Sequence, residues 1–144
     1  MAGNSVHEPS APPRAPVNVG DVMEPPLTTV DQNDHLAAAA YLMKHAGATA
    51  LVVLDGHETN RPVGIITEAD IVHTVADGKD VNDVRIHDLM TRSPTVVERT
   101  TSIRDAAETM VAGHFRHLPV VGSTGLAGVV DIRDICRALL GPAG

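Results

Sequence analysis

The sequence has 144 residues, a formal net charge of −7 and a hydrophobic fraction of 43%, which is the composition of an ordinary globular protein. The acidic balance, together with one Phe, one Tyr and no Trp, argues against a nucleic-acid partner, which needs a basic face or aromatic stacking platforms. A single cysteine, Cys136, excludes an internal disulfide and a multi-cysteine zinc site, and its helical surroundings favour a small core or interface residue.

Residues 1–18 are rich in Pro and Ala and show no periodicity, which predicts a disordered tail. This stretch has no apolar region typical of a secretory signal. No uncharged apolar run approaches the ~18 residues that a transmembrane helix needs. We therefore expect a cytoplasmic protein with no membrane partner.

The rest of the chain is a duplication. A shift of 67 positions places residues of the same type on one another: Asp21 on Asp88, Met23 on Met90, Thr28 on Thr95, Met43 on Met110 and Val53 on Val120. After the loop at 56–61 the shift becomes 64, so that Gly64 meets Gly128 and Asp70 meets Asp134. The pattern predicts a first repeat at 19–76, a polar linker at 77–83 and a second repeat at 84–140.

Each copy predicts the same order of elements. A short piece at 19–23 or 86–90 leads into an extended Thr-x-Val segment, and a helix follows. Apolar residues spaced i, i+3, i+4 and i+7 mark its buried face: Leu36, Ala39, Ala40 and Met43 in the first copy, and Ile103, Ala106, Ala107 and Met110 in the second. We expect N-caps at Asp34 and Thr101, and helix ends at Gly47 and Gly113.

A continuous apolar run, 49–54 or 117–121, is typical of a buried strand. A loop with glycine leads to a second strand at 63–66 or 126–130, and a final helix follows at about 68–76 or 132–140. The fold class is therefore mixed α/β (α+β), with the unit β-α-β-β-α occurring twice.

Three passages of the duplicated unit resemble the cystathionine-β-synthase (CBS) domain family over residues 19–140. They are the N-terminal segments 19–23 and 86–90 of the two repeats, the strand motif at 116–121, and the Gly-x-x-Thr-x-x-Asp signature at 64–70. The resemblance implies tandem CBS repeats packed about a pseudo-twofold axis with two clefts, and a homodimeric disc. It also implies clefts that bind AMP, ADP, ATP or S-adenosylmethionine and report their occupancy to a partner protein.

Thr67 and Asp70 are the first candidate ligand residues. A Thr-x-x-acid pattern at a helix start is close to a capping box, so the residues alone are explained by capping. The resemblance adds that Asp70 accepts bonds from ribose hydroxyls, while Thr67 binds ribose or phosphate at a helix N-terminus. The backbone around 48–50 would hold the adenine edge. By the same resemblance the candidate ligand residues are Thr28, Ala48, Thr49, Ala50, Ile66, Thr67, Asp70, Thr95, Phe115, Arg116, His117, Val130, Asp131, Arg133 and Asp134.

The second copy departs from the signature, because Asp131 stands where Thr or Ser is expected. Its charge should repel a phosphate, with compensation expected from Arg116 and His117. Arg133 either helps or is a solvated helix residue. The first copy lacks the basic pair, and residues 19–80 carry ten acidic and three basic residues, net −7, against seven of each in 81–144. We hypothesise two unequal clefts. The first would suit a nucleoside or monophosphate, and the second would accept more phosphate or none.

Catalysis is not supported by the sequence, which has no Gly-x-Ser-x-Gly elbow, Walker loop or dinucleotide loop. His114 and His117 are too few for a metal site. We therefore expect a non-catalytic sensor with no required cofactor. The alternative is a structural dimerisation module with vestigial clefts. The ligand, the regulated partner and the parallel or antiparallel arrangement of the dimer stay open.

Overall fold

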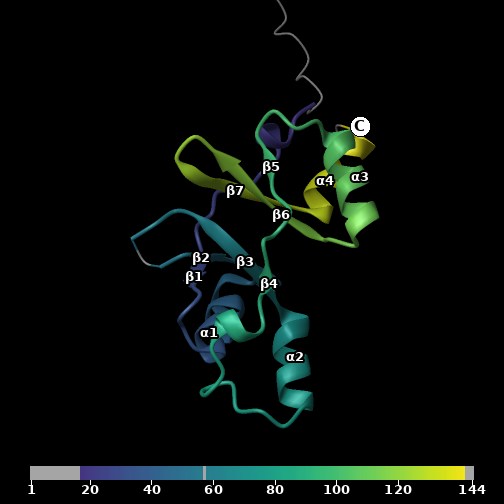
Figure 1. Cartoon of the computed structure of the whole chain (residues 1–144). Helices are drawn as coiled ribbons and strands as arrows, with labels where there is room; N and C mark the ends of the chain where they lie inside the picture. The colour runs from purple at the N-terminus through teal and green to yellow at the C-terminus, as the bar shows by residue number, and fades with distance from the viewer. Residues whose placement is uncertain (1–16, 57, 142–144) are drawn as a thin grey trace, which may run out of the picture.

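The structure is a computed structural model that describes residues 17–56 and 58–141, and within them it has two sheets and four helices (Figure 1). The first repeat contains β1 (Thr29–Asp31), α1 (Leu36–Ala46), β2 (Ala50–Leu54), β3 (Pro62–Thr67) and α2 (Glu68–Ala76). The second contains β5 (Val97–Glu98), α3 (Ile103–Gly113), β6 (His117–Gly122), β7 (Gly125–Asp131) and α4 (Ile132–Leu140). The predicted β-α-β-β-α unit is confirmed in both copies.

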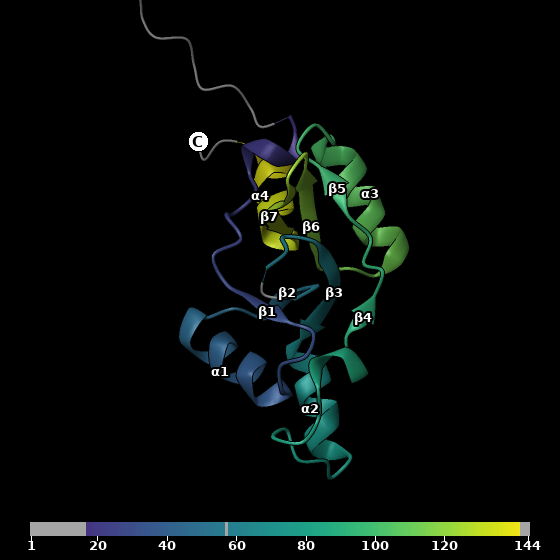
Figure 2. The same ribbon diagram turned by 60° about the vertical axis from the view of Figure 1, so that its left-hand side comes forward.

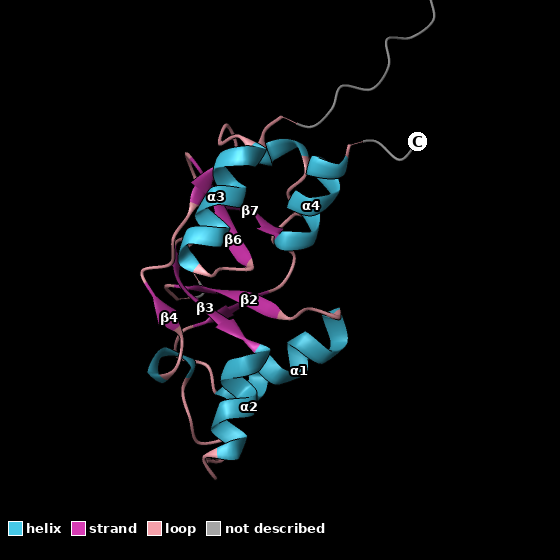
Figure 3. Cartoon of the chain, turned by 90° about the vertical axis from the view of Figure 1, so that its right-hand side faces the viewer, coloured by secondary structure: helices cyan, strands magenta, loops and turns pink. Residues whose placement is uncertain are grey.

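The strands lie between two helical layers. Figures 1 and 3 show α1 and α2 at one end of the molecule and α3 and α4 at the other. The first sheet has the order β1-β2-β3-β4, where β4 is Thr91–Arg92, and the second has the order β5-β6-β7. No helix in the described ranges is both long enough and apolar enough to cross a membrane.

The two sheets share their topology in detail. In each, the first strand runs parallel to the second and the second is antiparallel to the third. Each hairpin has an irregularity at the same place, between Val53 and Leu54 in one and between Val120 and Val121 in the other. Because these positions are 67 apart, the duplication extends to the register of the strands.

The first residues of each repeat pack against the core of the other repeat. We call residues 19–24 and 86–91 the lead segments; they contain the short 3-10 helices η1 (Val19–Asp21) and η2 (Ile86–Asp88). Val19 lies in the core of the second repeat, whereas Ile86 and Met90 lie in the core of the first. Figure 2 shows the purple N-terminal segment beside α4 and β7. Each core is therefore completed by the other copy's lead segment.

Two glycines make room for this exchange. A Cβ atom at Gly64 would lie 2.5 Å from the Met90 sulfur, and one at Gly128 would lie 2.8 Å from the Met23 sulfur. The methionines belong to the exchanged lead segments, so each glycine allows a foreign side chain to approach the sheet. The backbone then pairs, with Thr91 beside Ile65 in one sheet and Glu24 bridging to Val129 in the other.

The linker and the N-terminal stretch also join the repeats. Main-chain carbonyls of Val81 and Val84 accept bonds from the first two N–H groups of α1, which supplies partners for a helix start. At the other end, Asn18 bridges to Ser102 of the second repeat. Residues 1–16 of the predicted tail lie outside the described residues.

The three extra residues of the first copy lie in a loop that contacts the second copy. The main-chain O of Asn60 accepts a bond from the Leu126 N–H at 2.8 Å, and its side-chain amide donates to the Leu126 carbonyl at 2.9 Å. Asn60 therefore holds the turn between β6 and β7 with a pair of bonds. This contact lies at the opposite end of the strands from the candidate site described below.

The predicted N-caps lie one residue too early. α1 follows His35, and α3 follows Ser102, whose hydroxyl accepts a bond from the Asp105 N–H at 3.0 Å. Asp34 and Thr101 instead accept bonds from main-chain N–H groups three residues earlier in the chain, at 3.2 and 3.1 Å. The prediction was wrong because these side chains close the preceding turn rather than cap the helix.

The helix ends are correct in one copy only. Gly47 caps α1 in the left-handed conformation, with φ of 65°, as predicted. In α3 the helix includes Gly113, and His114 takes the left-handed position with φ of 57°. The ring of Phe115 fills the space in which a Gly113 side chain would lie, so this glycine serves packing rather than the turn.

Candidate functional site

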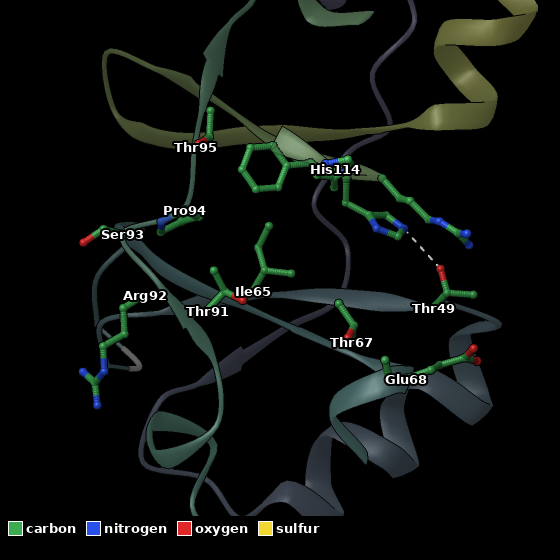
Figure 4. Close-up of a pocket in the computed structure, with 14 residues that line it drawn as sticks. Thr49, Ile65, Thr67, Glu68, Thr91, Arg92, Ser93, Pro94, Thr95 and His114 are labelled. Atoms are coloured by element: carbon green, nitrogen blue, oxygen red, sulfur yellow. Dashed lines mark hydrogen bonds between the residues drawn. The ribbon is translucent and has the colours of Figure 1, made fainter. Parts of the chain in front are cut away.

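A pocket of about 810 Å³ opens between the two repeats (Figure 4). It is lined by Thr49, Ile65, Thr67, Glu68, Ala69, Thr91, Arg92, Ser93, Pro94, Thr95, His114, Phe115, Arg116 and His117. Its walls come from the first repeat, from the connection that follows β4, and from the start of β6. The volume lies in the range of small-molecule and cofactor sites.

One wall of the pocket is the N-terminus of α2. Thr67 is the N-cap, and the Asp70 carboxylate accepts bonds from the Thr67 main-chain N–H at 2.8 Å and from its hydroxyl at 3.0 Å. The predicted capping box is therefore formed. Thr67 faces the pocket, whereas the half-buried Asp70 is not among its lining residues. The helix start offers main-chain N–H groups and the positive end of the helix dipole to a ligand.

The basic residues of the second repeat form the facing wall. The Thr49 hydroxyl and the His117 ring lie 3.1 Å apart and make a hydrogen bond between the two repeats, drawn as a dashed line in Figure 4. The pKa of His117 is lowered, chiefly because the ring is buried. The charge of Asp131 opposes this shift, and the charge of Arg116 adds to it. His117 is therefore harder to protonate than an isolated imidazole, and the Arg116 guanidinium lies beside it.

The remaining wall is apolar and includes two unusual backbone conformations. Ile65 and Pro94 point into the pocket in Figure 4, and Phe115 completes this surface. Ser93 and His114 are the two non-glycine residues with positive φ in the described ranges, at 48° and 57°, and both line the pocket. Such conformations cost free energy and cluster at binding and catalytic sites.

The start of α4, which the internal repeat relates to the start of α2, has a different chemistry. Carboxylate oxygens of Glu24, Asp131 and Asp134 lie within 4.8 Å of one another. Asp131 and Asp134 cap α4 reciprocally, with bonds of 2.9 and 3.0 Å between main-chain N–H groups and carboxylates. Burial, and then the charges of Asp131 and Glu24, raise the pKa of Asp134, whose side chain is almost enclosed at 5% exposure.

Comparison with known proteins identifies the family. The sequence model of the CBS domain matches residues 19–77 and 86–141, one match for each repeat. This chain belongs to the CBS domain family. The expected family and the tandem arrangement of its repeats are confirmed.

Relatives of this CBS pair include proteins with bound adenosine derivatives. It is 41% identical over 123 residues to an uncharacterized 17.7 kDa protein of Acidianus ambivalens, covering 85% of this chain and 73% of the relative. The chain spans 62% and 42% of two further curated relatives. CBSX2 of Arabidopsis thaliana in complex with AMP superposes with a TM-score of 0.71 at 30% identity, over 85% of this chain and 96% of the other.

A second solved structure extends the range of ligands. The CBS domain pair of protein MJ0100, in complex with methylthioadenosine and S-adenosylmethionine, superposes with a TM-score of 0.76 at 27% identity. The match covers 86% of this chain and 97% of that one. CBS pairs of this architecture therefore bind AMP in one case and S-adenosylmethionine in another.

The pocket of this CBS pair brings together some of the residues predicted from sequence. Thr49, Thr67, Thr95, Phe115, Arg116 and His117 line it. The side chains of Ile66 and Val130 do not, because both are fully buried in the hydrophobic cores, so only their main-chain atoms could reach a ligand. Thr28, Ala48, Ala50, Asp70, Asp131, Arg133 and Asp134 are not among its lining residues either.

Arg116 and His117 lie near both helix starts. Sequence reasoning assigned Arg116 and His117 to the second cleft as compensation for Asp131. Both line the pocket that contains Thr67, and both also lie at the start of α4, where the Arg116 main-chain O accepts a bond from the Ile132 N–H at 2.8 Å and His117 pairs with Asp131. The reason is that the repeats face each other, which places the start of β6 next to Thr49 at the start of the first hairpin.

Sequence reasoning missed several lining residues. Ile65 lines the pocket in place of Ile66, and strand alternation could have indicated this if the core face had been known. The stretch from Thr91 to Pro94 gave no signal, because it lines the pocket only through the exchange of the lead segments.

Proposed function

We propose that this CBS pair is a non-catalytic regulatory module that binds an adenosine-containing ligand in the pocket between its repeats. The observation that carries the proposal is that one pocket joins a helix N-terminus of the first repeat to the cation and aromatic ring of the second. AMP in CBSX2 and S-adenosylmethionine in MJ0100 support this ligand class.

The chemistry of the walls suggests how such a ligand would lie. A flat base suits the apolar surface formed by Phe115, Ile65 and Pro94, since aromatic rings stack on flat apolar groups. The ribose would lie near Thr67. A phosphate would then lie between the start of α2 and Arg116, where N–H donors and a guanidinium are available.

Signalling follows from the position of the pocket. A ligand that contacts both repeats favours one relative packing over others, to the extent that its affinity differs between them. The Thr49–His117 bond links the repeats across this pocket and would be reorganised or strengthened by a ligand. A cytoplasmic partner protein bound to the outer surface would sense that change.

Catalysis is no part of the proposal, and no cofactor is required by it. The carboxylates of Asp70, Asp131 and Asp134 accept main-chain bonds as helix caps, which explains their positions without an acid–base role. His117 bonds Thr49 across the repeats, so its position too is accounted for by binding and packing.

A binding experiment tests the proposal directly. Calorimetry and thermal denaturation with AMP, ADP, ATP, adenosine and S-adenosylmethionine would compare the wild type with Thr67→Val. A ligand at ~100 times its dissociation constant should stabilise the wild type by about 2.7 kcal/mol. Thr109→Val is the matched control, since the half-buried Thr109 lies on α3 and is not among the pocket-lining residues. A wild type that responds to none of these ligands would sink the proposal.

The second candidate is a structural dimerisation module, and exposed apolar side chains favour it. Val72 and Val75 on α2 are each 62% exposed, and Leu139 on α4 is 60% exposed. The repeat makes Val75 equivalent to Leu139, and Val72 equivalent to Cys136. Cys136 is exposed, so it does not belong to the core. These helix faces support a homodimer. Sedimentation of Val75→Glu and Leu139→Glu tests it, with monomers expected.

A further inference from the structure

We infer that Asn60 is a positioning residue for the pocket, because it fastens the two repeats at the far end of their strands and so sets how closely they approach at the pocket. For its effect on a ligand the inference rests on the proposed function. Its effect on the pocket itself is measurable without a ligand.

Asn60 joins the first repeat to the turn between β6 and β7 of the second. Its main-chain O accepts a bond from the Leu126 N–H at 2.8 Å, and its side-chain amide donates to the carbonyls of Leu126 at 2.9 Å and Thr124 at 3.4 Å. Gly125 has a φ of 107°, and a Cβ atom there would collide with the Asn60 main-chain O. We call these contacts the Asn60 clasp; they need both the amide and a glycine opposite it.

The loop that carries Asn60 is braced against its own repeat. The Thr59 hydroxyl donates to the Asp55 carbonyl at 2.6 Å, and the Asp55 N–H donates to the Arg61 carbonyl at 3.0 Å. The Asp55 carboxylate accepts a bond of 2.8 Å from the side-chain amide of Gln32, which follows β1. Because these bonds hold the loop to the first sheet, the clasp links the two sheets and not merely two loops.

The second repeat does not return this contact within the part of the chain that the structure describes. Two residues connect Gly122 to Gly125, which pair with each other, whereas the loop of the first repeat is three residues longer. At the pocket, the starts of the two hairpins are linked by the Thr49–His117 bond between side chains. A clasp that includes a main-chain bond thus holds one end, and a more adaptable bond between side chains links the hairpins at the pocket.

Loss of the clasp would reach the pocket through the relative packing of the sheets. Without the Asn60 side chain, the repeats would populate a wider range of separations, and the Thr49–His117 bond would be made less of the time. A ligand that contacts both repeats would then have to order them on binding, and this entropic cost lowers its affinity. By linkage the same ligand tightens the clasp, because the coupling between two sites is reciprocal.

The first test needs no ligand and uses the His117 ring, which bonds Thr49 across the repeats and whose pKa is lowered chiefly by burial. In Asn60→Ala the ring should become more exposed, so NMR titration should give a pKa closer to that of an isolated imidazole than in the wild type. Thr59→Ala removes a bond made within the same loop and is the matched control, expected to leave the titration unchanged. Neither variant alters the charged and titratable groups around the ring, which are Glu68, Arg92, His114, Arg116 and Asp131.

Calorimetry with AMP and with S-adenosylmethionine measures the effect on a ligand. Asn60→Ala should bind about 3- to 10-fold more weakly than the wild type, as expected of a residue that modulates coupling without contacting the ligand. Thr59→Ala should bind as the wild type does. Hydrogen exchange gives the reciprocal readout: the ligand should slow exchange of the Leu126 amide, which bonds across the repeats, more than that of the Thr101 amide, which bonds within the second repeat.

The outcomes separate this inference from the proposed function. An unchanged His117 titration in Asn60→Ala would overturn the inference and leave the proposed function standing. A shifted titration with unchanged affinity would overturn it too, because the packing would then not reach the ligand. A wild type that binds no adenosine derivative, with the titration still shifted in Asn60→Ala, would overturn the proposed function and leave Asn60 as the residue that sets the packing at the pocket.

A second variant guards against a loss of folding. Asn60→Asp keeps the shape of the side chain and removes its N–H donors, so it should shift the His117 titration and the ligand affinity in the same directions. Circular dichroism of each variant checks that the fold is intact. Opposite shifts in two folded variants would overturn the inference.

Discussion

The starts of α2 and α4 share a backbone arrangement but differ in the side chains around them. Each has a capping box, a glycine two residues before the last buried strand position, and a neighbouring residue from the other repeat's lead segment. Thr67 in one is Asp131 in the other. The comparison teaches that caps, glycines and core residues maintain the same backbone in both repeats, while the polar side chains at the helix starts are free to differ.

The largest expected effect concerns the exchanged lead segments and the cores that they complete. Ile86 is fully buried in the core of the first repeat, although it belongs to the second in sequence. Ile86→Ala should lower the free energy of unfolding by about 2–5 kcal/mol, because it leaves a cavity. Urea denaturation followed by circular dichroism measures it, and both repeats should unfold in one transition. Val72→Ala on the exposed face of α2 is the control, expected within ~0.5 kcal/mol of wild type.

The two glycines offer a matched pair of smaller effects. A methyl group at Gly64 would meet the Met90 sulfur and the Thr91 carbonyl, and one at Gly128 would meet the Met23 sulfur and the Glu24 carbonyl. Either alanine variant should lose about 1–3 kcal/mol in thermal or urea denaturation, since overpacking displaces neighbouring atoms. Gly122→Ala, with no neighbour nearer than 3.8 Å, should be almost neutral. Loss at only one of the paired glycines would contradict the symmetry of the exchange.

The next prediction tests phosphate recognition in the pocket. Arg116→Ala should weaken AMP binding about 10- to 100-fold, because a hydrogen bond to a charged group contributes ~1.5–3 kcal/mol. Adenosine, which has no phosphate, should bind nearly as before. Arg133→Ala, on the exposed side of α4, is the control and should leave both affinities unchanged. Equal losses for AMP and adenosine in Arg116→Ala would point to packing rather than phosphate recognition.

The smallest expected effect concerns the pH dependence of stability at the acidic cluster of Glu24, Asp131 and Asp134. The folded-state pKa of Asp134 is raised, so its charged form is disfavoured on folding, and stability is lost as pH rises through the folded-state pKa. Asp134→Asn should therefore be slightly more stable than wild type at pH 7, by less than about 1 kcal/mol, and this advantage should vanish below pH 4. Melting temperatures at the two pH values measure it. Asp70→Asn is the matched change in the first repeat. An equal gain in stability for that variant would contradict the expected difference between the starts of α2 and α4.

Local features of the fold could be predicted from the sequence. The order of strands and helices, the capping box at Thr67 and the helix end at Gly47 follow from hydrophobic spacing and local hydrogen bonding. The N-caps at Asp34 and Thr101 were one residue out, because a short polar side chain serves a turn and a helix start equally well. Which of the two roles such a side chain takes depends on the direction of the main chain after it.

Long-range features could not be predicted. Val19 and Ile86 are apolar residues in short segments, and their sequence does not say which core they enter. The same is true of Arg116, whose partners across the pocket are set by how the repeats face each other. Within an apolar run such as 63–66, alternation exists but the buried face is fixed only by packing. The site is therefore a property of the assembled pair.

The exchange of lead segments makes the pair indivisible. A fragment that ends at the linker would lack Ile86 and Met90 from its core, and a fragment that begins there would lack Val19 and its neighbours. Either half alone would therefore have a hydrophobic core that lacks some of its side chains and is partly open to solvent. The two halves, made as separate polypeptides, should each remain poorly folded alone and become ordered when mixed, since each carries the piece that closes the other.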